Sequence, residues 1–165
     1  MHFSTLVAAT FVAVASAKDI VYPPIINLGR HGYPHGNQFI AWSPFTPTTT
    51  QDVVKLCDTR GSIKGTATWT AVRTVNTYVL DPICRKPFNL TDDDTGTTYH
   101  NLELACVDDN IPISAEPEVT AVVDRNTNKT VHTCTRVPAD SEAGTAESCT
   151  RSANGGVMYL YACTA

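Results

Sequence analysis

The segment 88–106 restricts the fold more than any other part of the sequence. Apolar and polar residues alternate on both sides of an acidic, glycine-containing stretch at 92–96. A period of two is typical of a strand with one buried and one solvent-facing side, and Asp and Gly favour a chain reversal. The pattern therefore predicts a β-hairpin, with Leu102 and Leu104 on the buried face and Glu103 on the opposite face.

Further alternating or apolar stretches are separated by turn residues. They predict strands at 66–72, 75–80, 119–124, 130–136 and 157–163. Thr49 and Asp52 resemble a helix-capping pair, which favours a short helix at 49–57, although the Val-Val pair at 53–54 equally permits a strand. The segment 139–148 is expected to be a loop. We therefore expect an all-β fold, mainly an antiparallel β-sandwich or barrel, with at most one or two short helices.

Residues 18–50 differ in composition from the rest, with five prolines and no cysteine. Proline lacks a backbone N–H donor, so this density argues against a helix or a central strand. We expect an N-terminal arm that packs across a β domain at 51–165, with a short strand at 38–42. Four aromatic residues of the arm are candidates for a contact surface, although core packing is the preferred expectation: Tyr33, Phe39, Trp42 and Phe45.

Residues 1–17 have the organisation of a secretory signal peptide. An apolar run from Leu6 to Val14 precedes Ala15-Ser16-Ala17, which has the small-x-small form of a cleavage site. The run is shorter than the roughly 20 residues that span a bilayer. The sequence therefore predicts a secreted, extracellular product that is not attached to a membrane after cleavage.

Six cysteines follow the predicted signal peptide. They are Cys57, Cys84, Cys106, Cys134, Cys149 and Cys163. An even number of cysteines in an exported chain predicts disulfide bonds, each typically worth about 2–4 kcal/mol. The absence of a Cys-x-x-Cys motif argues against a zinc finger or a redox motif. Six cysteines allow 15 pairings, and the sequence does not choose among them.

Two short motifs predict a modification of the exported chain. Asn89-Leu90-Thr91 and Asn128-Lys129-Thr130 are acceptors for N-glycosylation, which makes Asn89 and Asn128 the expected glycan positions. The formal charge of −4 comes without any run of Lys or Arg, so no strong nucleic-acid footprint is present.

Motifs that hold metals, phosphates or nucleophiles give little support for catalysis. His31 and His35 have helical metal-site spacing, but Gly32 and Pro34 between them exclude the helix. The acidic turn at 92–96 departs from a calcium-binding loop, because Thr97 stands where such a loop needs glycine. Neither Gly-x-Ser-x-Gly nor a phosphate-binding glycine loop occurs. We expect a non-catalytic protein without a metal or a cofactor.

One alternative is enzymatic. Tyr33-Pro34-His35 resembles the Tyr-Pro-His of the secreted fungal guanyl-specific ribonucleases, whose mechanism uses a His, a Glu, an Arg and a His in that chain order. The resemblance implies a site made of four residues: His35, Glu103, Arg125 and His132. Glu103 or His35 would be the general base, His132 the general acid, and Arg125 the ligand of the phosphate.

A second resemblance covers more of the chain. Cys57, a strand that bears Trp69, the segment 88–91 leading into 102–106, the segment 137–144 and Cys149 occur in that order. This order resembles the Alternaria major-allergen family of secreted fungal β-barrels.

The resemblance implies a non-catalytic allergen, effector or elicitor. Our main expectation is therefore a small cysteine-rich fungal effector that binds, or is recognised by, a host protein outside or inside the host cell. A carbohydrate-binding wall protein is a further alternative, but it needs a planar row of Trp and Tyr, and the chain has two Trp.

Overall fold

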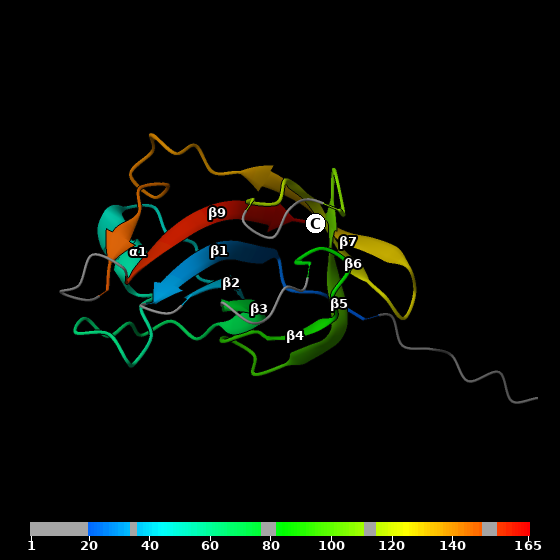
Figure 1. The fold of residues 1–165 in the computed structure, drawn as a ribbon. Coiled ribbons are helices and arrows are strands. Elements are labelled where there is room, and N and C mark those ends of the chain that lie inside the picture. The colour runs from blue at the N-terminus through cyan, green and yellow to red at the C-terminus, as the bar shows by residue number, and fades with distance from the viewer. Residues whose placement is uncertain (1–19, 34–35, 77–81, 111–114, 150–154) are drawn as a thin grey trace, which may run out of the picture.

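The computed structural model describes residues 20–33, 36–76, 82–110, 115–149 and 155–165. The predicted signal peptide and His35 lie outside these residues. The described chain is all-β with one short helix, which confirms the expected fold class (Figure 1). Its elements are β1 (Ile25–Tyr33), β2 (Gly36–Trp42), α1 (Thr50–Val54), β3 (Thr70–Asn76), β4 (Phe88–Thr91), β5 (Thr98–Cys106), β6 (Val119–Asp124), β7 (Lys129–Arg136), β8 (Glu147–Ser148) and β9 (Gly156–Thr164).

The strands form one antiparallel sheet with the order β3-β2-β1-β9-β7-β6-β5-β4, which curls into a near-barrel. Cα atoms of the two edge strands, β3 and β4, come within 8 Å of each other. Strands β7 and β8 pair with the same strand, β9, at its two ends, because Thr133 lies opposite Thr164 and Glu147 lies opposite Val157. The segment 139–148, expected to be a loop, therefore connects two strands that pair with opposite ends of β9, and its last two residues form the short β8.

Strands β4 and β5 form the hairpin that the alternation predicts. Phe88 lies opposite Leu102, and Leu102 and Leu104 are fully buried while Glu103 points to the other face. A bulge interrupts the pairing opposite Asn89, whose side-chain Oδ1 accepts the backbone N–H of Asn101 at 3.2 Å. Asn101 has a φ of 57°, which Asn tolerates better than most residues.

The expectation that proline excludes a central strand from the N-terminal arm is wrong. Strand β1 pairs with β2 on one side and with β9 on the other. Pro23 and Pro24 precede β1, and Pro44 and Pro47 follow β2, so these four prolines flank the ladders and remove no bond from them. The short strand expected at 38–42 is found within β2.

The two aromatic residues of β2 pack in the core, as preferred. Phe39 and Trp42 are both nearly inaccessible to solvent. Phe45 is half-buried, and Lys55 lies over its ring at 4.9 Å from the centroid. The side chain of Tyr33 lies outside the described part of the structure.

Helix α1 confirms the helix prediction and its cap. The Thr49 side chain accepts the N–H of Asp52, and the Asp52 carboxylate accepts the N–H of Thr49, each at 3.2 Å. Val53 and Leu56 are fully buried against the sheet.

The two strands expected at 66–72 and 75–80 are one strand, β3, as far as residue 76, beyond which residues 77–81 are not described. Trp69, expected to point inward from a strand, precedes β3 and is half-buried.

Two apolar clusters lie on opposite faces of β1, β2 and β9. The barrel interior includes Ile26, Leu28, Leu102, Leu104, Val122 and Leu160. The second cluster lies between the outer face of these strands and α1 with its following loop; it includes Ile40, Trp42, Val53, Leu56 and Tyr159. The fold therefore places a loop-covered layer on one side of a near-barrel.

All six cysteines are paired, which confirms the predicted disulfides and selects one pairing. The bonds are Cys57–Cys149, Cys84–Cys106 and Cys134–Cys163. Three disulfides are consistent with an extracellular protein. Among the described residues, none belongs to a helix long and apolar enough to cross a membrane.

Candidate functional site

The residues of the ribonuclease alternative do not converge in the described structure. Glu103 and Arg125 form an ion pair, with 3.1 Å between Oε2 and Nε. His132 lies opposite Val122, which faces the barrel interior beside Leu104, whereas Glu103 points outward. His132 and Glu103 are thus on opposite faces of the sheet. Since His35 lies outside the described residues, its position relative to them is not defined.

The charges around Glu103 are balanced. Arg85 is 3.9 Å from Glu103 and donates from Nε to Asp109 at 2.7 Å, so two guanidinium groups face two carboxylates. Hydrogen bonding to Asp109 raises the pKa of Arg85. Glu103 is buried, whereas both arginines are exposed, so solvent screens these ion pairs. The cluster is a surface ion-pair network, and it leaves no excess of positive charge for a phosphate.

Asp109 also lies beside a second set of candidate ligand atoms. Its carboxylate and the sulfurs of Cys84 and Cys106 are within 4.8 Å of one another. A metal-binding cysteine must be a thiolate, but these two sulfurs are bonded to each other. The arrangement is therefore explained by the disulfide.

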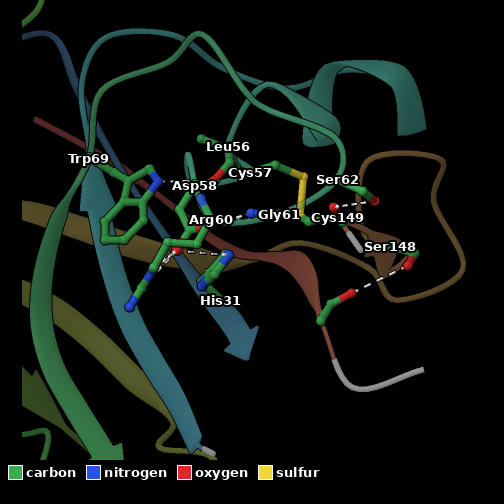
Figure 2. The surroundings of a disulfide bond; sticks show 11 residues. His31, Leu56, Cys57, Asp58, Arg60, Gly61, Ser62, Trp69, Ser148 and Cys149 are labelled. Atoms are coloured by element: carbon green, nitrogen blue, oxygen red, sulfur yellow. Dashed lines mark hydrogen bonds and ion pairs between the residues drawn. A yellow bond between two sulfur atoms is a disulfide. The ribbon is translucent and has the colours of Figure 1, made fainter. Parts of the chain in front are cut away.

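A candidate contact surface is the exposed loop 58–65, which we call the pinned loop. It begins directly after Cys57 and lies over Cys149, the disulfide partner of Cys57 (Figure 2). The N–H of Gly65 donates to the carbonyl of Cys57 at 2.8 Å, and the N–H of Ile63 donates to the carbonyl of Cys149 at 2.9 Å. One disulfide and two backbone bonds thus fix the loop at its base and near its tip.

Asp58 organises the first half of the pinned loop. Its Oδ1 accepts the backbone N–H groups of Arg60 and Gly61 at 2.9 and 3.2 Å, and its Oδ2 accepts the Arg60 Nε at 2.7 Å. Burial raises the pKa of the Asp58 carboxyl, but the bonds from Arg60 outweigh burial and hold this pKa below its usual value. The carboxylate therefore acts as the local cap of the turn.

Gly61 permits the close approach of this loop to the disulfide. A Cβ at Gly61 would lie 2.5 Å from the carbonyl oxygen of Cys149, which no side chain can tolerate without a shift of the backbone. The Ser62 hydroxyl donates to the same carbonyl at 3.4 Å. The short residues at 61–62 thus allow two separate segments of the chain to meet.

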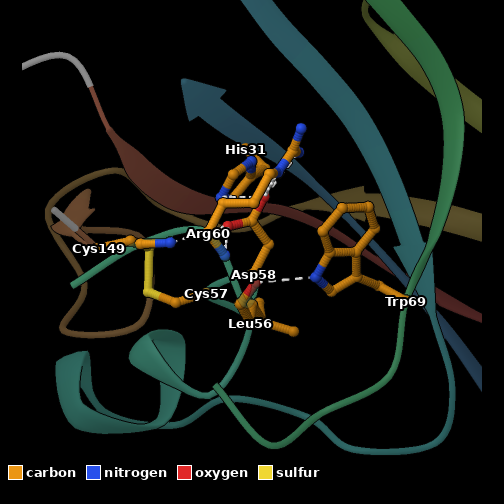
Figure 3. A network of polar contacts seen from close by, with 8 residues as sticks. His31, Leu56, Cys57, Asp58, Arg60, Trp69 and Cys149 are labelled. Atoms are coloured by element: carbon orange, nitrogen blue, oxygen red, sulfur yellow. Dashed lines mark hydrogen bonds and ion pairs between the residues drawn. A yellow bond between two sulfur atoms is a disulfide. The ribbon is translucent and has the colours of Figure 1, made fainter. Parts of the chain in front are cut away.

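A buried histidine, His31, packs beside Asp58 of the pinned loop (Figure 3). His31, on β1, is 2% exposed and stacks on Trp69, with ring centroids 5.6 Å apart. Its Nε2 is 4.0 Å from Asp58, which is too long for a hydrogen bond. Burial lowers the pKa of His31 despite the attraction of that carboxylate. Trp69 donates from Nε1 to the Leu56 carbonyl at 2.9 Å, which links the stacked rings to the segment just before Cys57.

The pinned loop presents an apolar side chain between two basic residues. Ile63 is 45% exposed, Arg60 is well exposed at its guanidinium, and Lys64 is exposed. This combination suits the binding of another molecule, and it offers no acid–base pair at the surface. The sequence did not reveal how this loop is supported, because the support from Cys149 depends on a disulfide between residues 92 positions apart.

The two expected glycan positions are on the surface. Asn89 is exposed on β4, and Asn128 is exposed in the turn between β6 and β7, where it has a φ of 54°. Both positions therefore meet the requirement that the acceptor be accessible.

Comparison of the chain with protein-family models, with curated proteins and with solved structures finds no match. The resemblances to the Alternaria major-allergen family and to the guanyl-specific ribonucleases therefore stay predictions. Any functional conclusion rests on the fold and on the chemistry of the surface.

Proposed function

We propose that this chain is a secreted, non-catalytic binding protein of the kind that fungi use as effectors or elicitors, and that the pinned loop is its contact with a host protein. The observation that carries the proposal is the fixed backbone of the loop together with the exposed Ile63. Binding residues commonly lie on loops held by a rigid scaffold. A loop that is already ordered loses little conformational entropy when it binds.

The side chains of the loop suggest the chemistry of the partner. Ile63 would enter an apolar pocket, and Arg60 and Lys64 would face acidic groups at the pocket rim. Apolar and Arg side chains at the centre of an interface often dominate its binding energy. Charges at the rim mainly raise the association rate and make it dependent on salt. The proposed partner is therefore a protein with an apolar pocket and an acidic border.

The ribonuclease alternative has weaker support. General acid–base catalysis needs the acid and the base within reach of one substrate. The face of the sheet that carries Glu103 and Arg125 is opposite to the face that carries His132. The crosslinked loop-bearing scaffold favours binding.

The proposed function is tested by comparing two surface variants. Ile63→Asp changes the exposed apolar residue of the pinned loop, and Val107→Asp makes the same change at another exposed apolar residue, just after β5. Wild-type and variant proteins are immobilised and incubated with extracellular fluid from plant leaves, and the bound proteins are quantified by mass spectrometry. Equal melting temperatures of the three proteins serve as the control for folding.

We expect a partner whose recovery falls severalfold with Ile63→Asp and is unchanged with Val107→Asp. That partner should bind less at high salt and should have an acidic surface. Identical recovery with all three proteins would remove the pinned loop as the contact. Cleavage of RNA by the purified wild-type protein at micromolar concentration would overturn the non-catalytic assignment.

A further inference from the structure

A second surface feature lies on the side where the described chain begins. Ile20 and Val21 are 56% and 82% exposed, although large apolar residues side by side are usually covered. They border a groove of about 400 Å³, which is within the range of small-molecule sites. The rest of the lining consists of Tyr22, Thr97, Thr98, Tyr99, His100 and Asn126.

The groove has a firm aromatic wall. Tyr22 stacks on Tyr99 with ring centroids 5.6 Å apart, and the Tyr22 hydroxyl donates to Asp124 at 2.7 Å. The next residue, Pro23, accepts a hydrogen bond from the buried His132. These contacts hold the segment that bears Ile20 and Val21 against the sheet. The groove is therefore a built feature of the fold.

One glycosylation motif starts at the rim of this groove. Asn126 lines the groove, and Asn128 follows two residues later in the same turn. Two Cα–Cα steps span at most about 7.6 Å, so the backbone that carries a sugar on Asn128 lies close to a residue that lines the groove. Asn89 is linked to Asn126 only through Asn101. The Asn101 side-chain amide donates to Asn126 Oδ1 at 3.0 Å, and the Asn101 backbone N–H donates to Asn89 Oδ1 at 3.2 Å.

The chemistry of the groove matches that of an N-linked sugar. N-acetylglucosamine has an apolar face and an acetamide methyl, which suit stacking on tyrosine, and hydroxyl groups, which suit Thr97, Thr98 and Asn126. A sugar placed there would cover Ile20 and Val21 and remove the apolar patch from water.

We propose that the glycan on Asn128 folds back over this groove, so that its first N-acetylglucosamine packs on Tyr22 and Tyr99 and shields Ile20 and Val21. The inference concerns a surface other than the pinned loop. It shares with the proposed function only the passage of the chain through the secretory pathway.

The test uses protein secreted from yeast behind a yeast export leader, so that it does not depend on the predicted signal peptide. Thr130→Ala removes the motif and leaves Asn128, which suits its positive φ, in place. Thr130→Ser keeps the motif and is the matched control. Thr91→Ala removes the motif at Asn89. Mass spectrometry of glycopeptides reports occupancy, and carbene footprinting reports the exposure of residues 20–22.

We expect Asn128 to be occupied, and labelling of residues 20–22 to rise severalfold in Thr130→Ala but to stay at the wild-type level in Thr130→Ser and Thr91→Ala. Trimming the wild-type glycan to its first sugar should leave the protection intact. An unoccupied Asn128 would overturn the proposal, as would equal labelling of wild type and Thr130→Ala. Loss of protection on trimming would overturn the role of the first sugar. None of these results depends on whether the pinned loop binds a partner.

Discussion

Replacement of His132 by phenylalanine should make stability less dependent on pH. The His132 Nε2 donates to the Pro23 carbonyl at 2.8 Å, so the neutral ring carries its proton on Nε2. The Nδ1 is buried and has no hydrogen-bond partner among the described residues. Protonation would place a buried N–H there without an acceptor. Burial accordingly lowers the pKa of His132 from 6.5, more than the bond to Pro23 raises it.

The magnitude follows from the linkage between protonation and folding. Below pH 6.5 this histidine binds a proton in the unfolded chain but stays neutral in the folded chain. The free energy of unfolding therefore decreases as the pH is lowered, until the pKa of the folded state is reached. The slope is at most about 1.4 kcal/mol per pH unit for each such histidine. His31, whose pKa burial also lowers, contributes in the same direction. Above pH 6.5 both contributions are fully present.

His132→Phe removes the contribution of this histidine to the pH dependence of the unfolding free energy, and it also removes the hydrogen bond to Pro23. Leaving the Pro23 carbonyl without its donor should cost about 1–3 kcal/mol at pH 7.5. The wild type should lose this advantage progressively as the pH falls below 6.5 towards the lowered pKa of folded His132. Acid thus weakens the wild type more than the variant.

The assay is urea unfolding under non-reducing conditions at pH 7.5, 6.5, 5.5 and 5.0, followed by tryptophan fluorescence. His31→Phe is measured alongside, and the double variant should show the flattest profile. The reasoning is refuted if the difference between wild type and His132→Phe is constant over this range. A loss of RNA cleavage in His132→Phe at unchanged stability would instead support the ribonuclease alternative.

Three further predictions concern stability. Cys57→Ala with Cys149→Ala opens a crosslink across 92 positions, which should cost about 4–5 kcal/mol by chain entropy and lower the melting temperature by roughly 10–20 °C; an unchanged melting temperature would contradict it. Tyr159→Phe leaves the buried Asn27 Oδ1 without the hydroxyl that donates to it at 2.5 Å, so urea unfolding should show a loss of about 1–3 kcal/mol in the free energy of unfolding. Because burial raises the pKa of Tyr159 to about 12, the stability of the wild type should also decrease above pH 10 more than that of the variant. Thr49→Ala removes the N-cap of α1 and should cost about 1 kcal/mol, whereas Thr50→Ala should cost much less.

Local patterns predicted most of the sheet. The hairpin of β4 and β5 and the strands β6, β7 and β9 follow from alternation and turn residues, because each needs only its neighbours in sequence to show a buried face. Strand β1 was missed because proline was counted over a window that included both flanks of β1 and β2. A proline excludes pairing only at its own position and disfavours helix at the residue before it.

The pinned loop could not have been predicted from local pattern, because its support comes from distant parts of the chain. Cys149 reaches it across 92 positions, and His31 reaches Asp58 from β1. A pattern of residues shows which side of an element is buried, but it does not show which distant segment covers it. The local sequence shows only that a tight turn follows a cysteine, because Asp58 and Gly61 come shortly after Cys57.

The same long-range contacts link the stability of the protein to its proposed function. The disulfide that closes the longest loop of the chain is also the base of the pinned loop, so opening it should reduce binding even at temperatures where the barrel remains folded. Affinity would then fall because the free loop must be ordered on binding, although Ile63, Arg60 and Lys64 are all still present. A loop variant such as Ile63→Asp removes the contact and leaves the order. The two changes should therefore weaken binding for different reasons. With the open crosslink, the loss should appear as an unfavourable change in binding entropy, whereas Ile63→Asp should reduce the apolar area that is buried and with it the heat-capacity change of binding.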